Sequence, residues 1–515
     1  MTEERVKKIV IIGGGSAGWL VAGRLANRFK DSTTDNGLDL TLIESGTIPT
    51  LGVGEGTWPS MRSTLNKIGI PETQFMTHCD ASFKQGSKFI DWQQGKGEFY
   101  YHPFELPAPY ADDFIGTLGT TFSGKSFAEC VCPTVALDSS DLAPKLITSA
   151  SYAHVVNYGY HLDANKFGTL LRDHALNHLG VKHLVDTVEG VDSDERGYIK
   201  AVTTASGQRI EGDLFIDCSG FASILMKGHY KIPFVSCEHR LFNNSAIAVQ
   251  IPYSSDAAPI QSYTHSTAKS SGWIWDIGLT SRRGVGYTYS SAHCTAEAAQ
   301  LELETYAKGV TANWQDLSYR NIKFNPGHLK KFWHKNCVAI GVSSGFLEPL
   351  EASALVMIEQ ASDMLADNLP ATYSAMSLIE KKYNERFSRH WQHIIEFLKL
   401  HYVTSQRDGD YWADNRQQQS WPEELVEKME FWKHFSPSRY DDTALRELFP
   451  TASYQYVLYG MGQAEPTPAA KLRKTEQMII RQLEDSFRKA AQLVRSLPTN
   501  RELLNALNTH NKTTA

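Results

Sequence analysis

Apolar residues near the start of the chain form two short runs around a glycine turn. Residues 7–29, KKIVIIGGGSAGWLVAGRLANRF, have the pattern of a strand, a turn and a helix, and DLTLIES (39–45) has that of a second strand. Further apolar runs occur at residues 207–220 and 336–365. The second of these has the pattern of a strand, a loop and a helix. We predict that these distant pieces assemble into one parallel sheet.

The middle of the chain has strand patterns, and the last third is mainly helical. SAIAVQIPY, GWIWDI and GVGYTYSS predict a second sheet, whereas apolar residues at three- and four-residue steps from Tyr383 to Leu398 predict a one-sided helix. We expect an α/β protein with a Rossmann-like domain, an interleaved β-sheet region and a helical C-terminal region. The expected boundaries are 1–365 for the Rossmann-like module, with the interleaved sheet at about 80–205 and 221–335, and 366–515 for the helical region.

The composition of the chain indicates which classes of partner it is expected to lack. The 515 residues are 42% hydrophobic and 21% charged, with a net charge of -6 and no long basic run. This balance argues against nucleic acid and anionic membranes as main partners. Seven cysteines without paired zinc spacing indicate reduced structural thiols, no metal site and a cytoplasmic protein.

The glycine turn has the spacing of a dinucleotide site. Gly13, Gly15 and Gly18 form G-x-G-x-x-G between strand and helix, where a tight turn, close approach to a pyrophosphate and close packing each favour glycine. Glu44 ends the next strand, where a carboxylate can accept ribose hydroxyls. A purely structural glycine turn is the alternative. DLFIDCSG with Asp217, the AIG turn at 339–341, and GVGEGTWP favour FAD over NAD.

Several motifs in order resemble the flavin-dependent halogenases of the tryptophan halogenase family. They are GGGSAGW, GVGEGTWP, the FK that contains Lys84, GWIWDI and FLEPLE. The resemblance runs from residue 6 to about 500. It implies FAD, used as FADH2 from a separate flavin reductase, and a halide ion as co-substrate. The implied cofactor contacts are Gly13, Gly15, Ser16, Ala17, Gly18, Glu44, Val53, Gly54, Glu55, Val188, Asp217, Gly341 and Leu347.

The resemblance implies that reduced flavin, O2 and halide give hypohalous acid, which passes through a tunnel to an electron-rich arene. Lys84 matches the lysine that hydrogen-bonds this oxidant or forms a haloamine, whereas Lys88 does not stand in that position. A solvated surface lysine is the ordinary alternative. Glu351 matches the carboxylate that stabilises the ring cation and removes its proton. Glu348, three residues earlier, is expected to brace the loop.

The halide position departs from the family pattern. The family has Ser-Thr-Gly after the glutamate, and this chain has Ala352, Ser353 and Ala354. Since backbone amides hold the halide in the family, Ser353 and Ala354 remain its candidate ligands. The changes leave bromide or chloride open, and a wider site favours bromide.

The stretch GWIWDI places two tryptophans on one face of a strand, because strand side chains alternate. The resemblance implies that Trp273 and Trp275 wall the flavin off from an arene that would otherwise be hydroxylated. Ordinary core packing is the alternative. Gly278 replaces the proline that usually ends this motif.

The substrate pocket is expected to be aromatic. His102 and Phe104, in YYHPF, match an element that stacks on the substrate ring, and Phe449 stands where relatives have a tryptophan. Ala444 falls where tryptophan-using relatives have a glutamate. A site without that charged partner gains little from a zwitterion, so indole or a similar arene fits better than free tryptophan. A carrier-tethered substrate stays open.

Two other functions remain open at this stage. An FAD-dependent aromatic hydroxylase would use the same flavin with substrate beside it, and a non-catalytic binding protein would tolerate loss of the flavin contacts. Halide dependence separates the first from a halogenase, and flavin binding tests the second. The expected partners are a small aromatic substrate and a transient reductase, and the chain is expected to be a monomer or homodimer.

Overall fold

The computed structural model describes residues 5–30, 37–47, 54–107, 125–438, 440–441, 448–463 and 473–514. The chain forms two compact units, each assembled from three separate segments. The first unit contains residues 1–81, 162–237 and 325–391, and the second contains 82–161, 238–324 and 392–515.

The first unit is built on a six-stranded sheet. Strand β1 pairs in parallel with β2 on one side and β12 on the other, and β12 pairs in parallel with β21. The predicted parallel sheet of distant segments is therefore confirmed. Residues 9–12 of β1 and 214–216 of β12 are apolar and buried, as expected for central strands that are covered on both faces. In spatial order the strands are β20 (Trp333–His334), β21 (Cys337–Ala339), β12 (Leu214–Asp217), β1 (Lys8–Ile12), β2 (Asp39–Glu44) and β8 (Lys182–Val185).

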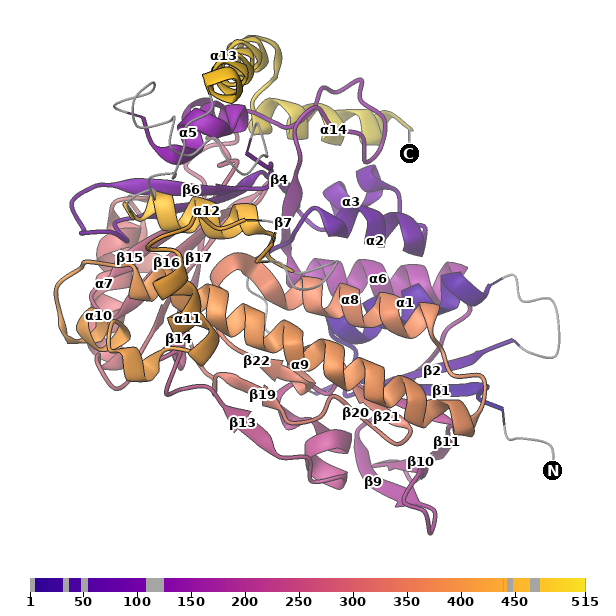
Figure 1. The fold of residues 1–515 in the computed structure, drawn as a ribbon. Helices are drawn as coiled ribbons and strands as arrows, with labels where there is room; N and C mark the ends of the chain where they lie inside the picture. Colours follow the sequence, from indigo (N-terminus) through magenta and orange to yellow (C-terminus); the bar gives the residue numbers. More distant parts are fainter. Residues whose placement is uncertain are drawn as a thin grey trace. The chain divides into compact units, whose positions relative to one another are not determined.

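Helices α1, α6 and α8 of the first unit lie side by side (Figure 1). Buried Arg24 on α1 pairs with Asp363 on α8, with 2.6 Å between Nε and Oδ1. This ion pair joins the helix after the glycine turn to the helix after FLEPLE. The main helices of the unit are α1 (Ser16–Phe29), α2 (Ser60–Ile68), α3 (Glu72–His78), α6 (Ala164–His178) and α8 (Ser353–Asp367), and α9 (Tyr373–Val403) begins in it.

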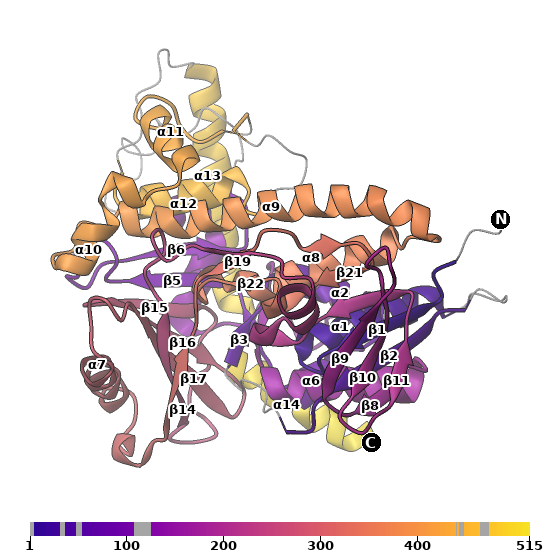
Figure 2. The same ribbon diagram turned by 90° about the horizontal axis from the view of Figure 1, so that it is seen from below.

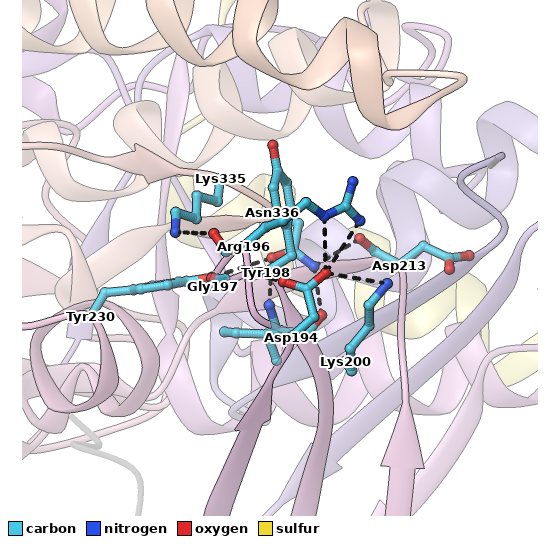
Figure 3. A network of polar contacts seen from close by, with 10 residues as sticks. Asp194, Arg196, Gly197, Tyr198, Lys200, Asp213, Tyr230, Lys335 and Asn336 are labelled. Atoms are coloured by element: carbon cyan, nitrogen blue, oxygen red, sulfur yellow. Dashed lines mark hydrogen bonds and ion pairs between the residues drawn. The ribbon is translucent and has the colours of Figure 1, made fainter. Parts of the chain in front are cut away.

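The first unit also contains two small sheets and the short strand β3 (Gly54–Gly56). Figure 3 shows the polar contacts that fix one of these sheets. Buried Asn336 accepts the Ile199 N–H through Oδ1 (2.9 Å) and donates through Nδ2 to the carbonyls of Ile199 (2.7 Å) and Asp213 (3.1 Å). These bonds anchor the sheet that begins at Val188. The small sheets are β9 (Val188–Ser193) with β10 (Ile199–Thr204) and β11 (Arg209–Glu211), and β13 (Phe234–Ser236) with β19 (Gly327–Leu329) and β22 (Gly345–Phe346).

The second unit is built on a seven-stranded, mostly antiparallel sheet, which confirms the predicted second sheet. One face packs on helix α7 (Ala296–Lys308) through an apolar cluster that includes Ile274, Tyr287 and Leu303 (Figure 2). In spatial order its strands are β18 (Tyr319–Lys323), β14 (Ser245–Pro252), β17 (Arg282–Tyr289), β16 (Gly272–Gly278), β15 (Thr264–Lys269), β5 (Gly86–Ile90) and β6 (Phe99–Pro103).

The C-terminal part of the second unit is helical, as expected. Helix α9 runs from the first unit into the second, and its apolar positions from Tyr383 to Leu398 are all buried, so the predicted one-sided helix is confirmed. In the described ranges no helix is both long and apolar enough to cross a bilayer. Strand β4 (Ser82–Lys84) pairs with β7 (Gly159–Asp163). The further helices are α5 (Phe127–Val131), α10 (Asp410–Asn415), α11 (Glu423–Phe431), α12 (Thr451–Gly460), α13 (Arg473–Ser496) and α14 (Asn500–Thr514).

Candidate functional site

The glycine turn of the first unit has the form of a phosphate cradle. Gly13 has a φ of 112°, and a side chain there would overlap the carbonyl of Cys218. A side chain at Gly15 would meet nothing within 4 Å, so this position is open to an incoming group. Gly15 also precedes α1, whose first N–H groups have no side-chain cap. These features fit the pyrophosphate of a dinucleotide cofactor.

Glu44 lies against this turn at the end of β2. Its carboxylate occupies the space that a side chain at Gly14 would need, and its Oε1 is 2.8 Å from Nε2 of His183. The Glu44 carbonyl accepts the N–H of Asp186, two residues before Val188. The structure therefore brings Glu44 and the start of β9 to the glycine turn, where a nucleoside would lie.

Two further predicted cofactor residues, Asp217 and Gly341, lie close to the glycine turn and the start of α1. Asp217 is fully buried and accepts backbone N–H groups of Leu225 (2.9 Å) and Met226 (3.0 Å), so it holds the turn after β12. Burial raises the pKa of Asp217, and these hydrogen bonds oppose that rise. Gly341 lies against Ala17. The remaining ones are Ser16 at the start of α1, Gly18 within it, and buried Leu347.

Strand β3, the next strand after β2 in the chain, carries a carboxyl group whose pKa lies near neutral pH. Gly54 and Glu55 lie in β3, and Val53 lies outside the described residues. Burial, with a smaller contribution from the Asp163 carboxylate, raises the pKa of Glu55 to about 7. We call residues 54–59, the described part of the GVGEGTWP motif, the flavin loop, because this motif is expected to lie over the flavin. Glu55 in this loop can therefore exchange a proton at physiological pH.

Glu351 occupies an unusual turn directly before α8. Glu351 has a φ of 62° and Ala352 a φ of 54°, and each left-handed non-glycine residue costs on the order of 1 kcal/mol. The indole N–H of Trp58 donates to the Glu351 carbonyl at 2.7 Å. Ser353 begins α8 and is buried, whereas Ala354 is exposed. No side chain caps this helix, so its first N–H groups are available to an anion.

A second buried carboxyl joins α2, which follows the flavin loop, to α8. Thr64 donates from Oγ1 to Oε2 of Glu359 at 2.6 Å. Burial, opposed by this hydrogen bond, raises the pKa of Glu359 to about 8. The folded protein therefore retains a proton at Glu359 that the unfolded chain releases above pH 4.5.

This proton makes stability depend on pH. Because the folded-state pKa lies above the unfolded value of 4.5, the free energy of unfolding should fall as pH rises from about 4.5 to 8. Glu359→Gln keeps the shape and abolishes this contribution. We expect the variant to match the parent near pH 5 and to exceed it at pH 9 by roughly 2–4 kcal/mol, since one pKa unit corresponds to about 1.4 kcal/mol. Urea unfolding at both pH values measures the difference, and a pH-independent difference would contradict the assignment.

The two tryptophans of β16 lie in the second unit on the face away from α7. Their ring centroids are 6.3 Å apart, and the exposed fractions are 1% for Trp273 and 6% for Trp275. The neighbouring residues on the adjacent strands are small: Trp275 lies over Gly286, and Ala268 is the cross-strand partner of Trp273. The prediction that both indoles share one face is confirmed.

Lys84 is buried at the end of β4, with an exposed fraction of 1%. Its Nζ lies 5.3 Å from the ring centroid of Phe104, so two predicted site residues meet. The strand is anchored beside the tryptophan motif because Ser82 donates from Oγ to the Gly278 carbonyl. Lys88 instead pairs with Asp138, with Nζ and Oδ2 2.7 Å apart.

His161 is a neighbour of Lys84 that the sequence did not reveal. It faces Ser82 across the β4–β7 pair, and its Nε2 lies 2.8 Å from Oγ1 of Thr264. Burial and the charge of Lys84 hold the pKa of His161 well below its usual value. This imidazole is therefore neutral at pH 7, and no spacing in GYHLD distinguishes it from a core histidine.

The predicted substrate residues His102 and Phe449 share a third aromatic, Phe397. Phe449 stacks on Phe397 with centroids 3.9 Å apart, and His102 lies 5.6 Å from the same ring. His102 Nε2 is also 2.9 Å from Oγ of Ser453 on α12. The structure brings His102 and Phe449 into one aromatic cluster, while Ala444 lies outside the described residues.

Comparisons with known proteins agree on one family. The model of the family described as tryptophan halogenase matches residues 8–476. Tryptophan 6-halogenase SttH of Streptomyces toxytricini is 34% identical over 497 residues, covering 92% of this chain and 93% of that protein. Among solved structures, a tryptophan halogenase from Shewanella frigidimarina is 45% identical with a TM-score of 0.94, covering 98% of both chains. BrvH, a flavin-dependent halogenase from Brevundimonas sp., is 30% identical with a TM-score of 0.83, covering 98% of this chain and 99% of that one.

Proposed function

Because the chain belongs to the tryptophan halogenase family and is a flavin-dependent halogenase, we propose that it halogenates an indole-type arene with the help of Lys84. The observation that carries this proposal is the burial of Lys84 against Phe104. At this position the three N–H donors of the ammonium lie beside an aromatic ring of the proposed substrate site, where they can act on an oxidant directed at that ring.

FAD is the cofactor that the first unit would hold. Gly15 leaves room for its pyrophosphate, and Glu44 would accept hydrogen bonds from its ribose. When bound in reduced form, the flavin would supply two of the four electrons that reduce O2, and halide would supply the other two, so that the products are hypohalous acid and water. A separate reductase would deliver the reduced flavin. Ser353 and Ala354 would hold the halide through their backbone N–H groups at the uncapped start of α8.

Lys84 would retain the oxidant, either by donating a hydrogen bond to hypohalous acid or by forming a haloamine. Glu351 would stabilise the cationic ring and accept its proton. Neutral His161 adds no second positive charge beside Lys84. The tryptophans of β16 would exclude the arene from the flavin, so that the ring is halogenated and not hydroxylated. Bromide and chloride are both proposed substrates.

The arene is proposed to be indole or a close analogue. His102 and Phe104 would stack on its ring, and Phe449 would close the pocket as part of the Phe397 cluster. These aromatic surfaces suit a neutral ring and offer no charged partner to an amino acid's ammonium group. We also propose that the protein is cytoplasmic, which the seven free cysteines support. Its proposed oligomeric state is a monomer or homodimer.

The substrate proposal is tested by competition. Purified enzyme, FAD, NADH and a flavin reductase are incubated with bromide or chloride and equal amounts of indole and free tryptophan. We expect mass spectrometry to show haloindole with at least a roughly tenfold preference, because a desolvated zwitterion without partners loses binding energy. A preference for free tryptophan would contradict the account of the pocket.

A further inference from the structure

Trp58 connects two segments that the proposed mechanism uses separately. It stands two residues after Gly56, the last residue of β3, and is half-buried. Its indole N–H crosses to the backbone carbonyl of Glu351 at 2.7 Å, although the two residues are 293 positions apart in the chain. The flavin loop and the Glu351 turn are therefore joined by a direct hydrogen bond.

The Glu351 turn needs such a restraint. Two consecutive left-handed residues, Glu351 and Ala352, are unfavourable for side chains with a Cβ and persist only where surrounding contacts determine them. The Ala352 N–H donates to the Pro349 carbonyl at 3.1 Å, which fixes one side of the turn. The Trp58 indole fixes the carbonyl on the peptide between Glu351 and Ala352. Since α8 begins at Ser353, the plane of this peptide sets where the first helical N–H groups point.

We propose that Trp58 is a positioning residue that couples the flavin loop to the turn carrying Glu351 and the halide. This inference rests on the proposed function. Loss of the indole N–H frees the peptide after Glu351 to rotate, so the Glu351 carboxylate and the amides of Ser353 and Ala354 move together. Halide binding and proton removal consequently depend on the conformation of the flavin loop.

Trp58→Phe tests this coupling, because phenylalanine keeps an aromatic ring and lacks the N–H. We expect the KM for bromide to rise roughly tenfold, the usual effect of one lost hydrogen bond at a site, and kcat to fall, while the KM for indole changes less than about twofold. Trp333→Phe is the matched control, since Trp333 donates a similar 2.8 Å bond to the Lys335 carbonyl within the same unit. Its kinetic constants should equal those of the parent. An unchanged bromide KM in Trp58→Phe, or an equal rise in the control, overturns the proposal.

Crystal structures of the parent and of Trp58→Phe separate this inference from the proposed function. We expect Glu351 to keep its left-handed conformation in the parent and to leave it in the variant. Retention of the left-handed turn in the variant overturns the role of Trp58, whatever the enzyme's activity. Absence of halogenated product from the parent enzyme contradicts the proposed function instead. In that case the role of Trp58 is still decided by comparing the two crystal structures.

Discussion

Lys84→Met should reduce formation of halogenated indole by at least about a thousandfold, while reduced flavin is still consumed at the parent rate. Methionine fills the buried position but carries no nitrogen. The substitution therefore removes the amine and leaves little cavity behind. The oxidant would still form, but no amine would retain it, and it would escape as free hypohalous acid. Mass spectrometry measures the product, and trapping with a water-soluble thioether measures the released oxidant.

Lys88→Met is the control for this prediction. Lys88 lies four residues along the chain and pairs with Asp138, so its loss should lower stability and leave turnover per folded molecule largely intact. Lys84→Arg adds a further distinction, because a guanidinium can hydrogen-bond the oxidant but forms a haloamine poorly. Halogenation by Lys84→Met at the parent rate would refute the role of Lys84.

Glu351→Gln should lower kcat for indole bromination by roughly a hundredfold to a thousandfold, with flavin binding unchanged. Glutamine retains the size and the left-handed turn but can neither stabilise the ring cation electrostatically nor accept its proton. Proton removal should then limit the rate. Fully deuterated indole should show a primary isotope effect in the variant and a value near unity in the parent.

Glu348→Gln is the matched control, because Glu348 is a buried glutamate of the same loop. We expect its effect on kcat to be less than about tenfold and its isotope effect to stay near unity. Equal losses in the two variants, or bromination by Glu351→Gln at the parent rate, would contradict the assignment of the base.

The parts of this molecule that follow from local pattern could be predicted from the sequence. The glycine turn and Glu44 could be placed because strand, turn and helix are contiguous and each imposes its own spacing. The shared face of Trp273 and Trp275 follows from the two-residue period of a strand.

Individual side-chain contacts between residues far apart in the chain could not be predicted, although the pairing of distant strands could. The bond from Trp58 to the Glu351 carbonyl and the pair of Thr64 with Glu359 each join residues almost 300 positions apart. No periodicity links such residues, and their geometry exists only after the sheet has formed. His161 was missed for the same reason, since its neutral state results from burial beside Lys84.

We propose that this enzyme directs flavin-derived oxidising power to halide and keeps the arene from being oxygenated. A single experiment distinguishes these outcomes: indole, O2, NADH, FAD and reductase are supplied to the parent enzyme, with and without bromide, and bromoindole and hydroxyindole are quantified. We expect bromoindole only when bromide is present, and no enzyme-dependent hydroxyindole in either reaction. Enzyme-dependent hydroxyindole in the bromide-free reaction would contradict this proposal and identify an aromatic hydroxylase.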